Sequence, residues 1–445
     1  MMLTSHRRTD APGAFSGLLR RAPREVPFAC RRRTSHSPSP LALACLCLAA
    51  VVSVRAEATT NCAAIPAVPG LVSSTVTYGT GGSSQTPLIG ALATKLQAAT
   101  NPITVVYASP AACTGVTTLL GSGSAGVITS TANYWDANGT EYTCTPPAGI
   151  GVPADFAVSG VFATSCSGVT ELPASFRDFG GPVLAWDFIV PATGSDQFSI
   201  SAQAAYFVFG DGASGSVVPW ANGSNAGVFI RTSTSAAQIA IGQAISVPAS
   251  GFKGTSESSN TNMITAVYGY ATPENSLGFV SSDVADASAS KVRVLAYQHF
   301  DQSCGYLPDS TSSIKDKANV RDGQYYLWSG THFISFVDQN GNPLGNSLNN
   351  DNAATAALIN SISFASGAPL SPEAVLTAEI STGNIPECAM TVGRSSDIGP
   401  QFSYEPTAPC VGFYEFTATG STTSTPCTST CPGTQVCRYG YCEVQ

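Results

Sequence analysis

Residues 75–95 read TVTYGTGGSSQTPLIGALATK. The alternating, β-branched run at 72–78 predicts a strand, because side chains at every second position share one face of a strand. A turn rich in glycine and serine follows. Apolar residues then recur at helical spacing, at Leu88, Ile89, Leu92 and Leu96. The stretch therefore predicts a strand, a tight turn and an amphipathic helix.

The turn has the composition of an anion site. The first turn of a helix carries unpaired backbone N–H groups and the positive end of the helix dipole, and glycines let a ligand come close. Ser83, Ser84 and Thr86 add hydroxyl donors, and Pro87 fits the first helical position. The stretch alone favours an ordinary well-capped helix over an anion site, because neither a G-x-x-x-x-G-K-[ST] nor a G-x-G-x-x-G motif is present.

Residues 1–58 are expected to be a signal peptide with a long n-region. Arginines at 31–33 precede an uncharged apolar run at 41–54, and residues 56–58, AEA, have the small-x-small form of a cleavage site. The run is too short for a comfortable membrane span, and no later segment is long and apolar enough to be one. We therefore expect a secreted protein, periplasmic or extracellular, that does not span the membrane.

The charge balance limits the partners. Beyond residue 58 the chain keeps 11 basic and 25 acidic residues, a net charge of about −14. Such an acidic chain is not expected to bind nucleic acid. A small anion is not excluded, because surface charge is screened over about 10 Å, whereas N–H groups and one buried arginine act at short range.

The cysteines indicate an oxidising compartment, since 11 of the 14 lie beyond residue 58. An odd number leaves one thiol unpaired or pairs it between chains. Disulfides are expected within two regions, whose cysteines are Cys113, Cys144 and Cys166, and Cys304, Cys388 and Cys410. No metal and no cofactor are expected, because the chain has only four histidines, and His299 and His332 do not lie in clusters with cysteine.

Strands and helices alternate over residues 62–416, which predicts an α/β fold with ligands at the carboxyl ends of strands. Strand, hydroxyl-rich turn and helix recur four times. The predicted strands are 103–108, 156–163, 182–191 and 226–231. Helices are predicted at 201–210, from Val116 after the turn SPAACTG, and in TSTSAAQIAIGQAI after residue 231.

A small C-terminal unit is expected after residue 416. Residues 417–426 form a linker rich in Ser and Thr. The tail, residues 427–445, is too small to bury a core, so two disulfides among its own cysteines, Cys427, Cys431, Cys437 and Cys442, must hold it. Its spacing looks like an EGF-like unit, with either a partner contact or a simple C-terminal cap as its role.

The order of these turns resembles that of the periplasmic phosphate-binding proteins of ABC importers, in the type 2 periplasmic binding protein-like family. The resemblance covers about residues 70–415. It is carried by GTGGSSQTP at 79–87, SPAACTGV at 109–116, DFAVSG at 155–160 and RTSTSAA at 231–237. It implies an α/β, two-lobed type 2 periplasmic binding protein fold over residues 59–416, with the small disulfide-rich tail appended.

The resemblance also implies a set of ligand-binding residues: Ser83, Ser84, Thr114, Ser159, Arg231 and Ser235. Each has a structural alternative. Arg231 could be a surface or salt-bridged arginine, the serines in helix-opening turns could be caps, and Thr114 and Ser159 favour a structural role. Asp155 in the third motif fits a solvated or capping carboxylate better than a ligand group.

Two departures from the family pattern put phosphate specificity in question. Gly160 stands where the family places an aspartate that accepts a hydrogen bond from protonated phosphate, and Ala236 and Ala237 stand where it places Gly-Thr. Without the carboxylate, a site loses the group that separates protonated from fully ionised oxyanions. The substitution Gly160→Asp is expected to restore that acceptor and to shift preference toward protonated phosphate.

The sequence therefore predicts a secreted solute-binding protein that binds phosphate or a related oxyanion between two lobes, with an ABC permease as a possible partner. The alternative is an adhesion or structural protein on a ligand-depleted version of the fold, which Gly160, Ala236 and Ala237 favour. An enzyme is not expected, because no nucleophile with an activating base is evident in the sequence.

Overall fold

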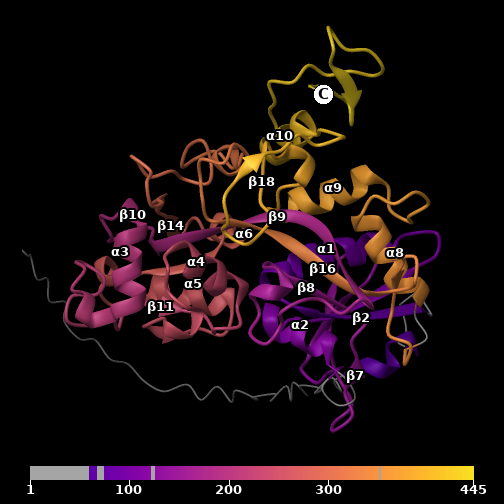
Figure 1. The fold of residues 1–445 in the computed structure, drawn as a ribbon, viewed down its shortest axis with the longest axis horizontal. Coiled ribbons are helices and arrows are strands. Elements are labelled where there is room, and N and C mark those ends of the chain that lie inside the picture. Colours follow the sequence, from indigo (N-terminus) through magenta and orange to yellow (C-terminus); the bar gives the residue numbers. More distant parts are fainter. Residues whose placement is uncertain (1–59, 68–74, 122–125, 350–351, 445) are drawn as a thin grey trace, which may run out of the picture. The chain divides into compact units, whose positions relative to one another are not determined.

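The computed structural model describes residues 60–67, 75–121, 126–349 and 352–444. These residues form a large mixed β-sheet with helices packed against it (Figure 1). The expected signal peptide lies outside these residues, as does the start of the run at 72–78. In order across the sheet, the strands are β1 (Thr60–Asn61), β6 (Glu141–Thr145), β5 (Ala132–Trp135), β3 (Ile103–Ala108), β2 (Thr75–Gly81), β8 (Phe156–Ser159), β16 (Trp328–Val337), β9 (Phe176–Pro191) and β13 (Gly278–Ser281). At its margins, β17 (Pro343–Leu344) pairs with β16, and β14 (Val292–Val294) pairs with β9. The α/β fold class is confirmed.

The quoted stretch forms the parallel centre of the sheet. β2 pairs in parallel with β3 on one side and with β8 on the other. The chain then makes a short 3-10 turn, η2 (Ser83–Gln85), and enters α1 (Thr86–Gln97), whose apolar stripe is buried. The predicted order of strand, turn and helix is confirmed.

One long antiparallel strand, β9, belongs to both lobes of the fold. The first part of β9 pairs with β16, which in turn pairs with β8 beside the parallel centre. The second part, from Trp186 to Pro191, pairs with β13 and β14 instead. β9 therefore links the lobe that contains β2 and β3 to the lobe that contains β13.

Each lobe buries its own apolar cluster against helices. One cluster packs α1, α8 (Asn352–Ile362) and α9 (Pro372–Ser381) against β3 and β8, and another packs α5 (Asn260–Gly269) against β13 and the end of β9. A third, larger cluster spans residues of both lobes. The remaining α-helices of the described residues are α2 (Ala112–Leu120), α3 (Ala202–Tyr206), α4 (Ala236–Ala244), α6 (Ser282–Ala287), α7 (Ala318–Arg321) and α10 (Val411–Thr419).

Short paired strands occupy several loops. These pairs are β4 (Val127–Ile128) with β7 (Val152–Pro153), β10 (Ser199–Ser201) with β15 (Ala296–Gln298), β11 (Phe229–Ile230) with β12 (Thr255–Ser256), β18 (Val392–Gly393) with β19 (Phe402–Ser403), and β20 (Val436–Arg438) with β21 (Tyr441–Glu443). None of the described helices combines the length and apolar character needed to cross a membrane.

Several predicted boundaries were wrong. The helix predicted from Val116 begins at Ala112, so Cys113 and Thr114 lie in its first turn rather than before it. The strand predicted at 156–163 ends at Ser159, and that predicted at 226–231 is only Phe229–Ile230. The helix predicted at 201–210 is α-helical to Tyr206 and continues as a π-helical turn, and β9 is longer than predicted.

The disulfides follow the regional prediction in part. Cys113 pairs with Cys166, and Cys388 with Cys410, each within its expected region. Cys144 pairs instead with Cys62, because β1 and β6 run side by side and bring these two cysteines into register. Cys304 is the free thiol of the described cysteines, as the odd count requires.

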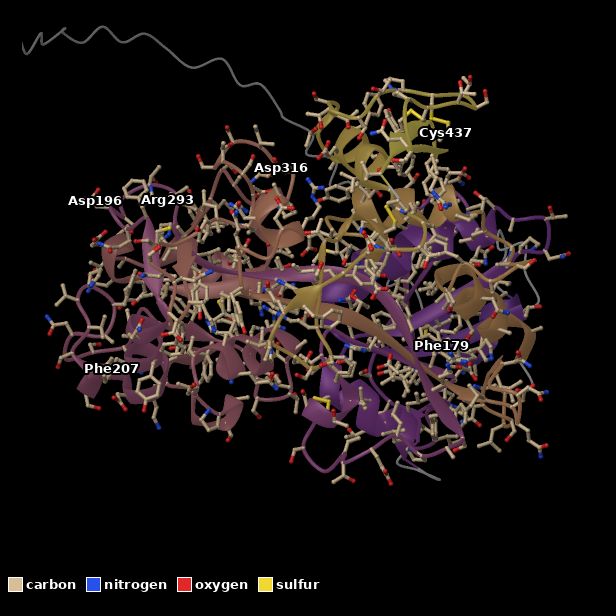
Figure 2. All side chains as sticks on the ribbon, turned by 45° about the horizontal axis from the view of Figure 1, so that its top comes forward. Phe179, Asp196, Phe207, Arg293, Asp316 and Cys437 are labelled. Carbon is tan, nitrogen blue, oxygen red and sulfur yellow. A yellow bond between two sulfur atoms is a disulfide. The ribbon has the colours of Figure 1, made fainter. Side chains whose placement is uncertain are left out.

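The tail is held as expected, by Cys427–Cys437 and Cys431–Cys442 (Figure 2, where Cys437 is labelled). It also contacts the body. The buried carboxylate of Glu443 accepts hydrogen bonds from the backbone N–H groups of Val411 and Gly412, at 3.1 and 2.8 Å, at the start of α10. α10 itself continues to Thr419, into the segment assigned to the linker. Glu443 therefore caps a helix of the body.

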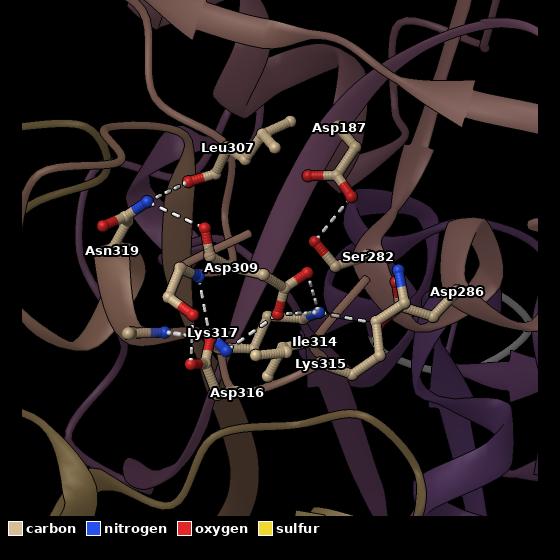
Figure 3. Close-up of polar contacts among 12 residues, drawn as sticks. Asp187, Ser282, Asp286, Leu307, Asp309, Ile314, Lys315, Asp316, Lys317 and Asn319 are labelled. Carbon is tan, nitrogen blue, oxygen red and sulfur yellow. Dashed lines mark hydrogen bonds and ion pairs between the residues drawn. The ribbon is translucent and has the colours of Figure 1, made fainter. Parts of the chain in front are cut away.

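A buried ionic network supports the far end of β9 (Figure 3). Lys317 Nζ lies 2.6 Å from Asp286 Oδ2 and 2.9 Å from Asp309 Oδ1. Burial opposes the charge of Lys317, but the two carboxylates raise its pKa overall. On β9, Asp187 accepts a hydrogen bond from Ser282 at 2.8 Å, and burial raises its pKa to about 7. Its salt bridges hold Lys317 between Asp286 and Asp309, which indicates a structural role.

Candidate functional site

Arg231 is the centre of the candidate site. It directly follows β11 and is only 7% exposed, so the predicted alternative of a surface arginine is wrong. Its backbone N–H donates to Gln238 Oε1 at 2.8 Å, which fixes the turn that leads into α4. Burial lowers the pKa of the guanidinium, while Glu257 acts in the opposite direction. An arginine side chain nevertheless stays protonated in proteins, so a positive charge is buried here.

The hydrogen-bond acceptors of this guanidinium are all neutral groups. Nε donates to the carbonyl of Glu257 at 3.1 Å, and Nη1 donates to Asn260 Oδ1. Nη2 donates to Ser83 Oγ and to the carbonyl of Ser258, both at the long distance of 3.3 Å. Among the described residues, no carboxylate forms an ion pair with Arg231. A buried cation that is hydrogen-bonded only to neutral groups, with Glu257 acting on it without an ion pair, can still gain from an anionic ligand.

Ser83 and Ser84 lie where the quoted turn meets α1. The contact between Ser83 and Arg231 joins residues 148 positions apart and brings the turn of one lobe to the arginine of the other. Ser84 is buried, and neither serine caps the helix through its side chain. The next residue, Gln85, is fully buried, and neither of its amide atoms has a hydrogen-bond partner among the described residues. This turn therefore holds more polar groups than capping requires.

Ser235 stands at the N-cap of α4 in an extended conformation and is 7% exposed. Its hydroxyl makes no capping hydrogen bond, so here too the cap interpretation lacks its bond. The first turn of α4, Ala236 and Ala237, is buried. The start of α4 therefore presents backbone N–H groups and the positive end of a helix dipole close in sequence to Arg231.

The second predicted turn, residues 109–116, is already bonded within the protein. The backbone N–H of Cys113 donates to the carbonyl of Thr234 at 3.1 Å, and the disulfide to Cys166 holds the same residue. α2 also lies very close to β2, since an added Cβ at Gly115 would be 2.5 Å from the Cα of Gly81. Thr114 is half-buried in this first turn, and no hydrogen bond links its side chain to Arg231.

Ser159 and Asp155 serve the backbone. Ser159 Oγ donates to the carbonyl of Val161 and accepts from its N–H, at 2.7 and 3.1 Å. Asp155 is fully buried, so of its two expected roles the structure favours the capping carboxylate over the solvated one. It accepts hydrogen bonds from the N–H groups of Tyr78 and Asn346, at 2.7 and 2.8 Å. Asp155 therefore ties the middle of β2 to the segment after β17.

Trp186 fills the space beside Gly160. An added Cβ at Gly160 would lie 3.0 Å from Trp186 Cζ2 and 3.2 Å from Ala236 Cβ. Trp186 is fixed, because its Nε1 donates to Ser329 Oγ at 2.8 Å and Ser329 Oγ donates to the carbonyl of Gly160. The expectation that Gly160→Asp restores an acceptor therefore stays a prediction, and it requires Trp186 or Ala236 to shift, since both lie close to an added Cβ.

A second group of functional side chains was missed by the sequence. His332 Nδ1 lies 2.7 Å from Asp178 Oδ2, although the two residues are 154 positions apart. β9 and β16 bring them together, and only the register of those strands could have revealed the pair. No hydroxyl or thiol of the described residues is bonded to His332 Nε2, so the pair lacks the nucleophile of a catalytic triad.

The described residues contain one group with the spacing to hold a metal ion, formed by Cys427, Cys431 and Cys442. All three are disulfide-bonded, so they have no thiolate to offer.

Comparisons with known proteins give matches of structure only. No family model matches the chain, and no curated protein matches it either. Among solved structures, a putative phosphate ABC transporter substrate-binding protein from Clostridium perfringens, with bound phosphate, is 11% identical. The match covers 70% of this chain and 99% of that protein's chain, with a TM-score of 0.46.

Two further structures show the range of the matches. An ABC-type phosphate transport receptor from Vibrio cholerae is 14% identical and covers 69% of this chain and 99% of its own, with a TM-score of 0.40. The reduced form of the OxyR regulatory domain from Pseudomonas aeruginosa is 8% identical. That match covers 64% of this chain and 96% of the domain's chain, with a TM-score of 0.33. At these values the matches assign neither a family nor a ligand.

Proposed function

We propose that this chain is a solute-binding protein that holds a small oxyanion, phosphate or a relative, between its two lobes. The observation that supports this function is Arg231, a buried guanidinium whose four acceptors are all neutral. Its two longest contacts, to Ser83 and Ser258, are the ones that an oxyanion would replace. A guanidinium can bind two oxygens of an oxyanion at once, and such charge-assisted bonds are stronger than those to a hydroxyl or a carbonyl.

In this proposal Ser83, Ser84 and Ser235 supply hydroxyl donors, and the first turn of α4 supplies backbone N–H groups. Thr114 and Ser159 are left out, because the first has no link to Arg231 and the second is committed to Val161. No carboxylate stands at position 160, so the site should bind sulfate at least as well as phosphate.

The setting of this function is also a proposal. Five disulfides among the described residues fit an oxidising compartment. We infer export through the expected signal peptide, no enzymatic activity, and delivery of the bound anion to an ABC permease.

A second function has its own support. Trp186 occupies the space beside Gly160, and Thr234 already accepts from the N–H of Cys113. Both contacts would be expected in an adhesion or structural protein that has kept the fold and lost the ligand. Under that alternative, the role of Arg231 is structural, and its hydrogen bond to Ser83 joins the two lobes.

Calorimetric titration of the full chain separates the two functions. The oxyanion-binding function predicts saturable heat with sulfate or phosphate at constant ionic strength, and none with chloride. The absence of saturable heat with both oxyanions would leave the structural alternative.

A further inference from the structure

A cavity of about 150 Å³ lies away from Arg231, where β9 and β16 meet the segment from Glu387 to Tyr404. This segment includes β18 and β19 (Figure 1). A cavity of this size holds one benzene-sized molecule. Its walls are largely aromatic and apolar, from Phe162, Trp328, Met390, Phe402 and Tyr404.

A β-bulge directs two polar side chains into the cavity. The pairing of β16 with β9 shifts between Gly330 and His332, and both Thr331 and His332 line the cavity. Adjacent residues of a regular strand point to opposite faces, and a bulge changes that. Thr331 is 1% exposed and His332 is 6% exposed, yet Thr331 Oγ1 and His332 Nε2 have no hydrogen-bond partner among the described residues.

The pairing of His332 with Asp178 decides what Nε2 can do. Nδ1 lies 2.7 Å from the Asp178 carboxylate, which can only accept a hydrogen bond, so Nδ1 carries the proton. In the neutral ring, Nε2 is therefore an acceptor. The ring is also held by Phe162, whose centroid is 4.1 Å away.

Two carboxyl groups of the lining face the same space. Asp397 uses Oδ2 for the N–H of Phe162 and the hydroxyl of Ser165, at 2.8 and 2.6 Å, while its buried Oδ1 has no partner among the described residues. Glu387 is exposed as a residue, but its carboxyl lines the cavity beside Gly180, where an added Cβ would lie 3.5 Å from Oε1. Burial raises the pKa of both carboxyl groups, although His332, and for Asp397 also Arg394, act in the opposite direction.

Arg394 also lines the cavity. Its guanidinium donates to the carbonyls of Trp328 and Tyr326, at 2.7 and 2.9 Å, and stacks on both of their rings, while its buried Nε has no partner among the described residues. Apart from this Nε and the Thr331 hydroxyl, the open groups of the lining are acceptors, and aromatic rings surround them. Such a site matches a ligand with N–H donors, a positive charge and a small apolar body.

We propose that this cavity binds a small primary ammonium ligand, with the ammonium at Glu387, Asp397 Oδ1 and His332 Nε2. The apolar body of the ligand then lies against the aromatic walls. These three residues are not among the described groups that have the spacing of a metal site. This inference is independent of the oxyanion function, since none of its residues contacts Arg231.

The test uses the full chain and n-butylammonium chloride, with binding followed by saturation-transfer NMR at constant ionic strength. Butan-1-ol serves as the neutral probe of similar size. The variant is Glu387→Gln, and the matched control is Glu171→Gln, at an exposed glutamate with no hydrogen bond among the described residues. Circular dichroism checks that both variants are folded.

The proposal predicts saturable binding of butylammonium, at least tenfold weaker binding of butan-1-ol, and at least tenfold weaker butylammonium binding by Glu387→Gln. Glu171→Gln should bind as the parent does. Asp397→Asn, tested separately, should also weaken binding. Equal affinity for the alcohol and the ammonium, unchanged affinity in Glu387→Gln, or no saturable butylammonium binding would each overturn it.

Discussion

The Arg231 site and the His332 cavity differ in how their polar groups are satisfied. At Arg231, the protein itself supplies acceptors for all three guanidinium nitrogens, and the N–H of Cys113 is taken by Thr234. In the cavity, buried polar atoms of Thr331, His332 and Asp397 have no partner among the described residues. The Arg231 guanidinium must exchange internal hydrogen bonds for a ligand, whereas the open atoms of the cavity lining can accept one without such an exchange.

This difference has an energetic consequence. A ligand that displaces existing hydrogen bonds gains only the difference between the new bonds and the old. Arg231 gains because its present partners are neutral and two of its contacts are long, at 3.3 Å. The cavity gains because an unpaired buried polar atom is already costly before the ligand arrives.

The largest effect is expected from Arg231→Lys. A lysine cannot hold two oxygens of an oxyanion in one plane, so the loss should be about 2 to 5 kcal/mol, which is more than tenfold in affinity. Calorimetry with sulfate measures it, and Arg177→Lys, at an exposed arginine, is the control. A variant that keeps the affinity of the parent would remove Arg231 from the site.

Gly160→Asp tests whether the space beside Gly160 is filled. We expect destabilisation of about 1 to 3 kcal/mol, because the new side chain must displace Trp186 or Ala236. Urea denaturation gives the free energy of unfolding. Gly269→Asp is the control, since no atom lies within 4 Å of an added Cβ there. If Gly160→Asp is as stable as the control, the tryptophan can yield and the position is open.

Much of the Arg231 region could be predicted from the sequence, because its signals are local. The strand at 103–108, the helix after the Gly/Ser turn and the helix after Arg231 each show in a short window of residues. The extent of β8 was not predictable, because Val161 uses its N–H and carbonyl for the Ser159 side chain instead of continuing the strand. Side-chain competition of this kind leaves no hydrophobic pattern.

The cavity could not be predicted, because it depends on contacts between distant residues. His332 and Asp178 meet only through the register of β16 and β9, and the bulge at Thr331 sets which side chains face inward. The filling of the space beside Gly160 by Trp186 is equally non-local. A single sequence shows neither register nor bulge when both strands are largely buried.

Glu379 should make the free energy of unfolding depend on pH. Burial, helped by Glu387, raises its pKa to about 8. The folded state holds this proton more tightly than the unfolded state, so the contribution to stability is lost as pH rises toward 8. Asp187, at about 7, acts with the same sign, and His299, at about 4, acts with the opposite sign only below about pH 6.5.

Between pH 6.5 and 8 we therefore expect stability to fall, with Glu379 contributing on the order of 1 kcal/mol. Glu379→Gln should reduce this slope, and Glu171→Gln should not. Urea denaturation at the two pH values provides the measurement. A slope that is identical in Glu379→Gln and the parent would show that this carboxyl does not titrate in the window.

The smallest effect is expected at the tail, away from both sites. Glu443→Ala removes the carboxylate that caps α10 and should cost about 1 kcal/mol, without changing sulfate affinity. Glu405→Ala, at an exposed glutamate, is the control. A change in sulfate affinity would mean that the tail acts on the Arg231 site as well as on α10.

A crystal structure of the full chain with sulfate would show directly which acceptors Arg231 uses when an oxyanion is present. We predict a sulfate with one oxygen at about 2.7 to 3.2 Å from Arg231 Nη2, in place of Ser83 Oγ, and another near the first turn of α4. An unchanged contact between Arg231 and Ser83, with no anion within hydrogen-bond distance of the guanidinium at saturating sulfate, would contradict it.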